Sequence, residues 1–281
     1  MGGPDPSRFH AVALPQTPGR PAIPNRTGRP AIPNRIPTLG RPRVHLRETG
    51  STNDRARELA EGGAPHGTLV TASSQSAGRG RQGRGWSAPA NSSLLMSLLL
   101  RPGSPCAARS SPPPGLLPLI AAVAVCDVAG EDALIKWPND IVLVRSSGHD
   151  LTKLAGILVE GRPQAGWAVL GIGLNVAVRI EELPVELRVS AATLGRDRDA
   201  IEPTLERLLA ALARRLAAPT AQTLDAWRAR DALRGREIGW ASGHGRALGI
   251  DAAGHLLVAL DGGGQIALDA GEVHLGPPAG A

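Results

Sequence analysis

Runs of apolar residues, separated by Gly- and Pro-rich segments, predict most of the elements between residues 44 and 233. Four segments carry helical patterns: the stretch 48–62, residues 116–128, residues 201–217 and a segment around Trp227. Thr52 or Asn53 is expected to cap the first helix, and Gly62–Gly63 to end it. Short apolar runs predict strands at 67–73, 94–100, 133–137, 141–144, 155–159 and 167–171.

The pattern changes at Arg234 to five short apolar segments with Gly-rich turns between them. They occupy residues 237–242, 246–251, 255–261, 265–269 and 272–275. Several short strands at close spacing are typical of a small β-barrel. We therefore expect two folded domains, 44–233 and 234–281.

Residues 1–43 carry no such pattern. They contain ten prolines and the repeat GRPAIPNR at 19–26 and 28–35, which offers only Ala and Ile for burial. We expect a disordered or polyproline-II tail. The net charge of +6 belongs to this tail, which holds seven arginines and one acid, whereas the remaining residues hold 24 basic and 24 acidic side chains. Any DNA binding is therefore expected to be weak, salt-sensitive and not sequence-specific.

The composition narrows the class of protein. With 42% apolar and 20% charged residues the chain can build a core. It has no apolar run long enough for a membrane span and no signal-like start. Two cysteines, Cys106 and Cys126, do not form a disulfide framework. These features together favour a cytoplasmic protein without a membrane partner.

Lysine is rare in this chain: 29 of 31 basic residues are Arg, and the two lysines are Lys136 and Lys153. In a composition that favours Arg over Lys so strongly, a remaining lysine indicates a position where a compact ammonium cannot be replaced by a guanidinium. Both stand in motif-like segments, KWPND and KLAG. Chance retention is the alternative.

The segment GRGRQGRGW at 78–86 combines glycines, which let backbone N–H groups turn inward, with three arginines. Such a loop suits a small anionic ligand, phosphate or carboxylate. An RGG-type nucleic-acid binder is a second interpretation, and a plain flexible loop is a third. The anion loop is favoured because the segment is single and lies between two apolar strands.

Further polar groups stand at strand edges in KWPND (136–140), KLAGILVE (153–160), GIGLN (171–175) and at a helix start in STN (51–53). Asp140 is a hard oxygen ligand suited to Mg²⁺. No nucleophile–base pair accompanies these groups. The inventory predicts chemistry in which the protein neutralises and positions its substrates, as in phosphoryl or nucleotidyl transfer.

In this order, STND, GRGRQGR with Trp86, KWPND, KLAGIL and GIGLNV resemble the biotin protein ligases, over about residues 44–276. The resemblance implies an α+β fold with a mixed, largely antiparallel sheet, related to class II tRNA synthetase cores. It also implies a C-terminal SH3-like barrel. The implied reaction forms biotinyl-5′-AMP from biotin and ATP, with Mg²⁺, and transfers biotin to a lysine of a biotin carboxyl carrier protein.

The matched motifs imply roles for individual residues. Lys153 and Arg81 would be catalytic. The biotin site would comprise Ser51, Thr52, Asn53, Gln75, Arg79, Gly80, Arg81, Lys153 and Gly156. The ATP site would comprise Arg84, Trp86, Lys136, Asn139, Asp140 and Asn175, with Asp140 as the Mg²⁺ ligand.

Two other functions compete with this one. A lipoate or octanoate ligase shares the fold, and a non-enzymatic biotin- or nucleotide-binding regulator would share the site. A repressor role is not expected, because residues 1–43 cannot form a helix-turn-helix. A homodimer is possible on sequence alone.

Overall fold

The computed structural model describes residues 39–102, 104, 113–145, 150–162, 164, 166–269 and 271–276. The tail expected at 1–43 therefore lies almost wholly outside the described residues. The chain divides into the units Met1–Asn34 and Arg35–Ala281, and the second holds every element given below.

The central element is a seven-stranded sheet in the order β1-β2-β3-β7-β6-β5-β4. The strands are β1 (Arg43–Thr49), β2 (Leu69–Gln75), β3 (Ser93–Leu100), β4 (Leu134–Lys136), β5 (Asp140–Val144), β6 (Leu151–Arg162) and β7 (Trp167–Asn175). Only β1 and β2 pair in parallel, and the other neighbours are antiparallel. The expected mixed, largely antiparallel sheet is thus confirmed.

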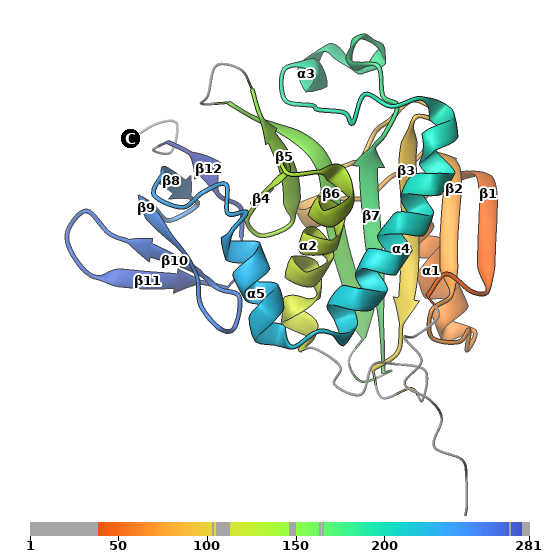
Figure 1. Ribbon diagram of the computed structural model, residues 1–281, viewed down its shortest axis with the longest axis horizontal. Coiled ribbons are helices and arrows are strands. Elements are labelled where there is room, and N and C mark those ends of the chain that lie inside the picture. The colour runs from red at the N-terminus through yellow and green to blue at the C-terminus, as the bar shows by residue number, and fades with distance from the viewer. Residues whose placement is uncertain are drawn as a thin grey trace, which may run out of the picture. The chain divides into compact units, whose positions relative to one another are not determined.

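Helices cover both faces of this sheet (Figure 1). Helix α1 (Thr52–Glu61) packs on β2, β3 and β7. On the other face lie α2 (Leu117–Ala129), α4 (Ile201–Ala217) and α5 (Thr220–Arg228), while the short α3 (Val185–Arg188) follows β7 along the chain. The main core fills the space beneath α2, α4 and α5, and a smaller apolar cluster lies under α1. None of the described helices is both long and apolar enough to cross a membrane.

A second, five-stranded sheet follows in the order β11-β10-β9-β8-β12. Its strands are β8 (Glu237–Trp240), β9 (Gly243–Ile250), β10 (Leu256–Ala259), β11 (Gln265–Leu268) and β12 (His274–Leu275). All its pairings are antiparallel. In the part of the chain that the structure describes, β11 and β12 do not pair with each other, so the expected closed barrel is not confirmed.

The start of α1 differs from the expectation. The N-cap is Ser51, and it makes no capping hydrogen bond with its side chain. Thr52 and Asn53, expected as caps, are instead the first helical residues, and both are buried. Their polar atoms bond to residues of the sheet, as described below, so the prediction of a local capping role was wrong.

The packed part of the chain begins earlier than the sequence pattern indicates. Leu39 is buried in the main core, and Arg43 opens β1 and forms a bidentate ion pair with Glu202 of α4. Strand β1 has few apolar positions, which explains why its pattern did not predict a strand. Strands β6 and β7 are also longer than predicted. Strand β6 extends beyond both ends of its apolar run, and β7 continues through residues 172–175, past the glycine at 171 where the predicted strand ended.

Candidate active site

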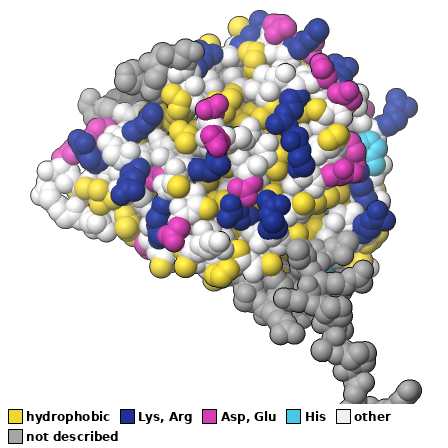
Figure 2. Space-filling model, in the orientation of Figure 1, with side chains coloured by type: hydrophobic (Ala, Val, Ile, Leu, Met, Phe, Trp, Pro, Cys, Tyr) yellow, Lys and Arg dark blue, Asp and Glu magenta, His cyan; other side chains and the backbone are white. Residues whose placement is uncertain are grey.

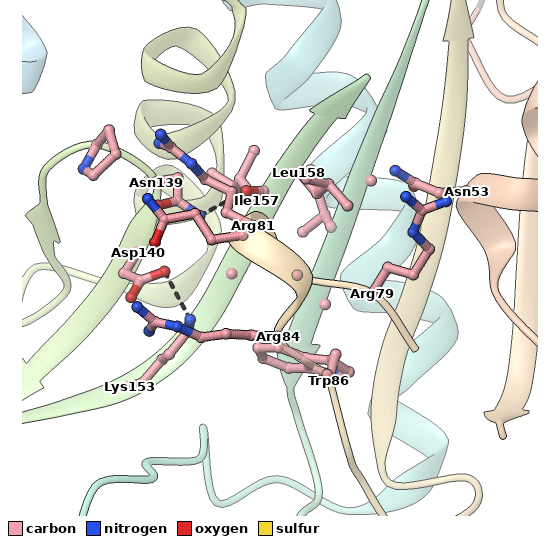
Figure 3. Close-up of a pocket in the computed structure, with 18 of the residues that line it drawn as sticks. Asn53, Arg79, Arg81, Arg84, Trp86, Asn139, Asp140, Lys153, Ile157 and Leu158 are labelled. Atoms are coloured by element: carbon pink, nitrogen blue, oxygen red, sulfur yellow. Dashed lines mark hydrogen bonds and ion pairs between the residues drawn. The ribbon is translucent and has the colours of Figure 1, made fainter. Parts of the chain in front are cut away.

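One pocket lies on the α1 face of the sheet, where β3, β7 and β6 run side by side and the Gly/Arg loop 78–86 crosses over them (Figure 3). Its lining contains fourteen of the fifteen residues singled out from the sequence: Ser51, Thr52, Asn53, Gln75, Arg79, Gly80, Arg81, Arg84, Trp86, Lys136, Asn139, Asp140, Lys153 and Gly156. The motifs are far apart in sequence, and the sheet brings them together.

The floor of the pocket is made by glycines. Gly171 and Gly173 alternate along β7 on the pocket face, and Gly173 pairs with Gly156 of β6. A Cβ at 171 would lie 2.1 Å from Asn53 Oδ1, and one at 173 would lie 2.5 Å from the Trp86 ring. The two glycines of the GIG motif therefore leave space for neighbouring side chains. Gly171 leaves space for the Asn53 amide, and Gly173 leaves space for the Trp86 indole.

One end of the pocket is a buried group of neutral polar side chains. Gln75 Oε1 accepts hydrogen bonds from Thr52 N at 2.7 Å and from Thr52 Oγ1 at 3.0 Å. Asn53 Oδ1 accepts from Ser97 Oγ at 2.6 Å. This end thus offers fixed amide dipoles and hydroxyls, which suit a neutral polar head group.

The opposite end is cationic. Lys153 Nζ lies 2.8 Å from Asp140 Oδ1 and 5.8 Å from the centre of the Trp86 ring. Figure 3 shows Asn139, Asp140, Lys153 and Arg84 at this end, with Asn53 and Arg79 at the other. Because β5 and β6 pair with Val142 opposite Lys153, the long segment between Asp140 and Lys153 does not separate these two side chains.

Burial and mutual repulsion shift the charged groups at this end. Burial lowers the pKa of Lys136, Asp140 opposes the shift, and Lys153 and Arg84 add to it. Burial also lowers the pKa of Arg81. Excess positive charge at a partly desolvated site is an arrangement that a polyphosphate or carboxylate would relieve.

Arg79 pairs with two carboxylates, whereas Arg84 of the same loop pairs with one. It bonds to Asp54 Oδ1 of α1 at 2.6 Å and to Glu160 Oε1 of β6 at 3.1 Å, and the Asp54 hydrogen bond raises its pKa. Arg79 therefore ties the loop to the protein and has less capacity left for a ligand than Arg81 or Arg84.

Asn175 is the one candidate that does not line the pocket. It is 6% exposed, its Oδ1 accepts from Ser93 Oγ at 3.1 Å, and its Nδ2 donates to the Ala192 carbonyl at 2.9 Å. In this structure its amide holds the segment after β7 to the sheet. The amide types in GIGLN gave no signal that would distinguish this use from ligand binding.

Several lining residues were not predicted. Gly271, Glu272 and Val273 reach the pocket from the second sheet, and Glu272 forms an ion pair with Arg84. Glu160, at the end of KLAGILVE, lies behind the amide end and also was not assigned. The signal for Glu160 was present, because an acid directly after a predicted apolar strand needs a partner. Nothing in GEVHL indicates that Glu272 contacts Arg84, which lies 188 positions earlier in the chain.

The sequence and the fold of this chain are similar to those of known proteins. The family model described as "Biotin/lipoate A/B protein ligase family" matches residues 46–176. The chain is 35% identical over 250 residues to the biotin–[acetyl-CoA-carboxylase] ligase of Mycobacterium tuberculosis, which covers 81% of this chain and 86% of that protein. The chain belongs to the biotin protein ligase family.

Other members of the family show how far the likeness extends. The chain is 38% identical over 165 residues to the bifunctional ligase/repressor BirA of Bacillus spizizenii, which covers 56% of this chain and 47% of that relative. It thus spans about half the length of that relative. The biotin protein ligase of Aquifex aeolicus in complex with biotin and ATP superposes with a TM-score of 0.67 and 26% identity, covering 83% of this chain and 98% of the other.

Proposed function

We propose that this chain is an ATP-dependent biotin ligase that forms biotinyl-5′-AMP and transfers biotin to a lysine of a biotin carboxyl carrier protein. The observation that carries the proposal is the two-ended pocket. Neutral amides and hydroxyls gather at one end, and Lys153, Arg81, Arg84 and Lys136 gather at the other. Biotin has a neutral ureido head and an anionic tail, which match the two ends.

In the first step, a carboxylate oxygen of biotin attacks the α-phosphorus of ATP, and the bond to the bridging oxygen breaks to release pyrophosphate. Two anions must meet, and at about 4 Å their repulsion costs roughly 4 kcal/mol at an effective dielectric of 20. Lys153 would offset this cost, because its ammonium lines the cationic end of the pocket beside Asp140. Arg81 would lie over the acyl-phosphate from the loop side.

In the second step, the neutral amine of the acceptor lysine attacks the acyl carbon of the adenylate. The bond from that carbon to the phosphate oxygen breaks, AMP leaves with the electron pair, and the amine loses a proton. Water would compete at the same carbon. The Gly/Arg loop, which Arg79 fastens to α1 and β6, is the element that would exclude it.

Magnesium would enter with ATP. Among the described residues there is no group of three or more His, Cys, Asp or Glu side chains that could hold a metal. Two carboxylates lie at the cationic end: Asp140 pairs with Lys153, and Glu272 pairs with Arg84. One carboxylate together with phosphate oxygens is a normal Mg²⁺ environment, so Asp140 would serve a substrate-borne ion.

The location and partners follow as further proposals. We expect a cytoplasmic enzyme without sequence-specific DNA binding. On the face drawn in Figure 2, over α4 and α5, basic and acidic side chains are interspersed and form no single basic patch. This distribution agrees with the expectation that any DNA binding involves only the basic tail at residues 1–43.

The test is to incubate the purified chain with ATP, Mg²⁺ and either biotin or lipoate, together with a biotin carrier domain or a lipoyl domain. We expect pyrophosphate release with biotin, and a mass increase of the carrier domain by one biotinyl group. Modification of the lipoyl domain alone would assign the chain to the lipoate branch. Biotin binding without pyrophosphate would indicate a regulator.

A further inference from the structure

The amide of Asn53 is held from two sides by residues that no part of the proposed reaction uses. Its Oδ1 accepts from Ser97 Oγ at 2.6 Å, and its Nδ2 donates to Glu160 Oε2 at 2.8 Å. Asn53 and Ser97 are buried, and the Glu160 side chain is 19% exposed. Gly171 leaves room for this amide, because a Cβ at that position would lie 2.1 Å from Asn53 Oδ1.

The two contacts differ in whether they fix the orientation of the Asn53 amide. The Ser97 hydroxyl can donate or accept, so it tolerates either orientation of the amide. An ionised carboxylate can only accept, so Glu160 forces Nδ2 toward itself and Oδ1 toward Ser97. Reversing the amide would place two oxygens together with no hydrogen between them.

Gln75 is fixed in the same manner by a different group. The backbone N–H of Thr52 can only donate, and it holds Gln75 Oε1 at 2.7 Å. Gln75 lines the pocket, so its NH₂ group, which lies beside Gly78 of the Gly/Arg loop, is the donor that this amide has left. With both amides fixed, the pocket presents one set pattern of donors and acceptors to the head of a ligand.

Glu160 has a second connection. Its Oε1 lies 3.1 Å from Arg79 of the Gly/Arg loop and 3.5 Å from Arg57 of α1. One carboxylate thus contacts the helix that carries Asn53, the amide itself, and the loop that crosses the pocket. Glu160 thus links the loop to the amide end of the pocket.

We propose that Glu160, supported by Ser97, is a positioning residue that sets the hydrogen-bonding polarity of the Asn53 amide and thereby the recognition of the ureido head. This inference rests on the proposed function, because it takes biotin as the ligand. Glu160 itself touches neither the reacting carboxylate nor ATP in this scheme.

The experiment measures binding as well as turnover, on the full chain. Glu160→Gln keeps the size of the side chain but offers both a donor and an acceptor, so it no longer dictates the amide orientation. We expect the Kd for biotin, from calorimetry, to rise about 10- to 100-fold. The KM for ATP should stay within about twofold of wild type. We also expect selectivity for biotin over 2-iminobiotin, whose ureido oxygen is replaced by nitrogen, to fall at least about threefold.

Matched variants separate the two connections of Glu160. Glu58→Gln removes an exposed carboxylate of α1 that pairs with Arg55, and it should change none of these quantities. Asp54→Asn removes the other carboxylate partner of Arg79 and leaves the Asn53 contacts intact. If Glu160 acted only through Arg79, Asp54→Asn would weaken biotin binding equally. We expect less than a third of the effect.

Two outcomes would overturn the inference while leaving the proposed function intact: unchanged biotin Kd and selectivity in Glu160→Gln, or equal losses of biotin and ATP affinity. Should Glu160→Gln fail to fold, Ser97→Ala takes its place, with a smaller expected rise in biotin Kd and rescue by Ser97→Thr. No rise in Ser97→Ala would equally refute the proposal. A wild-type chain that binds no biotin would instead refute the proposed function.

Discussion

Replacing Gly173 by Ala should displace the indole of Trp86 and damage the pocket with little change elsewhere. The added methyl group would lie 2.5 Å from Cε2 of the ring and 2.9 Å from Cδ2 and Cζ2. Ordinary contact begins near 3.4 Å, so the ring must withdraw by about 1 Å. Strand β7 pairs on both sides at this position, with Leu95 and with Gly156, so the backbone has little freedom to yield.

The cost of such overpacking is typically about 1–3 kcal/mol. Trp86 lines the pocket and lies 5.8 Å from Lys153 Nζ, so part of that cost will appear as misplacement of the site. If it falls wholly on the reaction, the expected loss is about 5- to 150-fold in kcat/KM. If it falls wholly on folding, the free energy of unfolding drops by the same amount and the activity of the folded fraction is unchanged.

The assay combines ATP–pyrophosphate exchange driven by biotin with thermal unfolding. Gly262→Ala is the control, since a Cβ there meets nothing within 4 Å. Trp86→Phe in the Gly173→Ala background should recover part of the loss, because the phenyl ring is smaller than the indole and lacks the outer carbon Cζ2. Full exchange activity and full stability in Gly173→Ala would refute the placement of the indole over β7.

Four other predictions can be checked with the same protein. Lys153→Arg should lose more than about tenfold in adenylate formation, because a guanidinium cannot place a compact charge between two anions; retention of half the activity would contradict this. Arg81→Gly should form adenylate but release it, so that serum albumin mixed with the variant, biotin and ATP becomes biotinylated, whereas albumin mixed with wild type does not. Asp231→Asn should stabilise the fold more at pH 8 than at pH 4, measured as a difference in Tm. The reason is that burial raises the pKa of Asp231, so wild type loses stability as the pH rises through the unfolded and folded pKa values; a pH-independent difference would argue against it. Removing residues 1–38 should leave carrier biotinylation within about threefold, since the first lining residue in the described part of the chain is Ser51. Removing residues 1–43 should lower Tm by taking away Leu39 and the Arg43–Glu202 pair.

The sequence by itself determined the four longer helices and most strands, because these depend on apolar periodicity that any burial arrangement must satisfy. The short helix α3 was not predicted. The helix 201–217 was predicted with the boundaries observed, and the buried strand at 94–100 was placed within one residue. The site motifs were also readable, since glycines, arginines and the two lysines stand out against a composition that disfavours lysine.

Only the tertiary structure decided which partner each polar group takes. Thr52 and Asn53 read as helix caps, yet their side chains bond across to Gln75, Ser97 and Glu160. The sequence predicts Asn175 as a ligand-binding residue, yet its amide forms hydrogen bonds with Ser93 and with the Ala192 carbonyl. A local sequence pattern shows the chemistry of a side chain but not the direction in which it points. The hydrogen bonds of Asn53 reach Ser97, 44 positions away, and Glu160, 107 positions away. Such bonds depend on strand register and on the face of the sheet that each residue occupies.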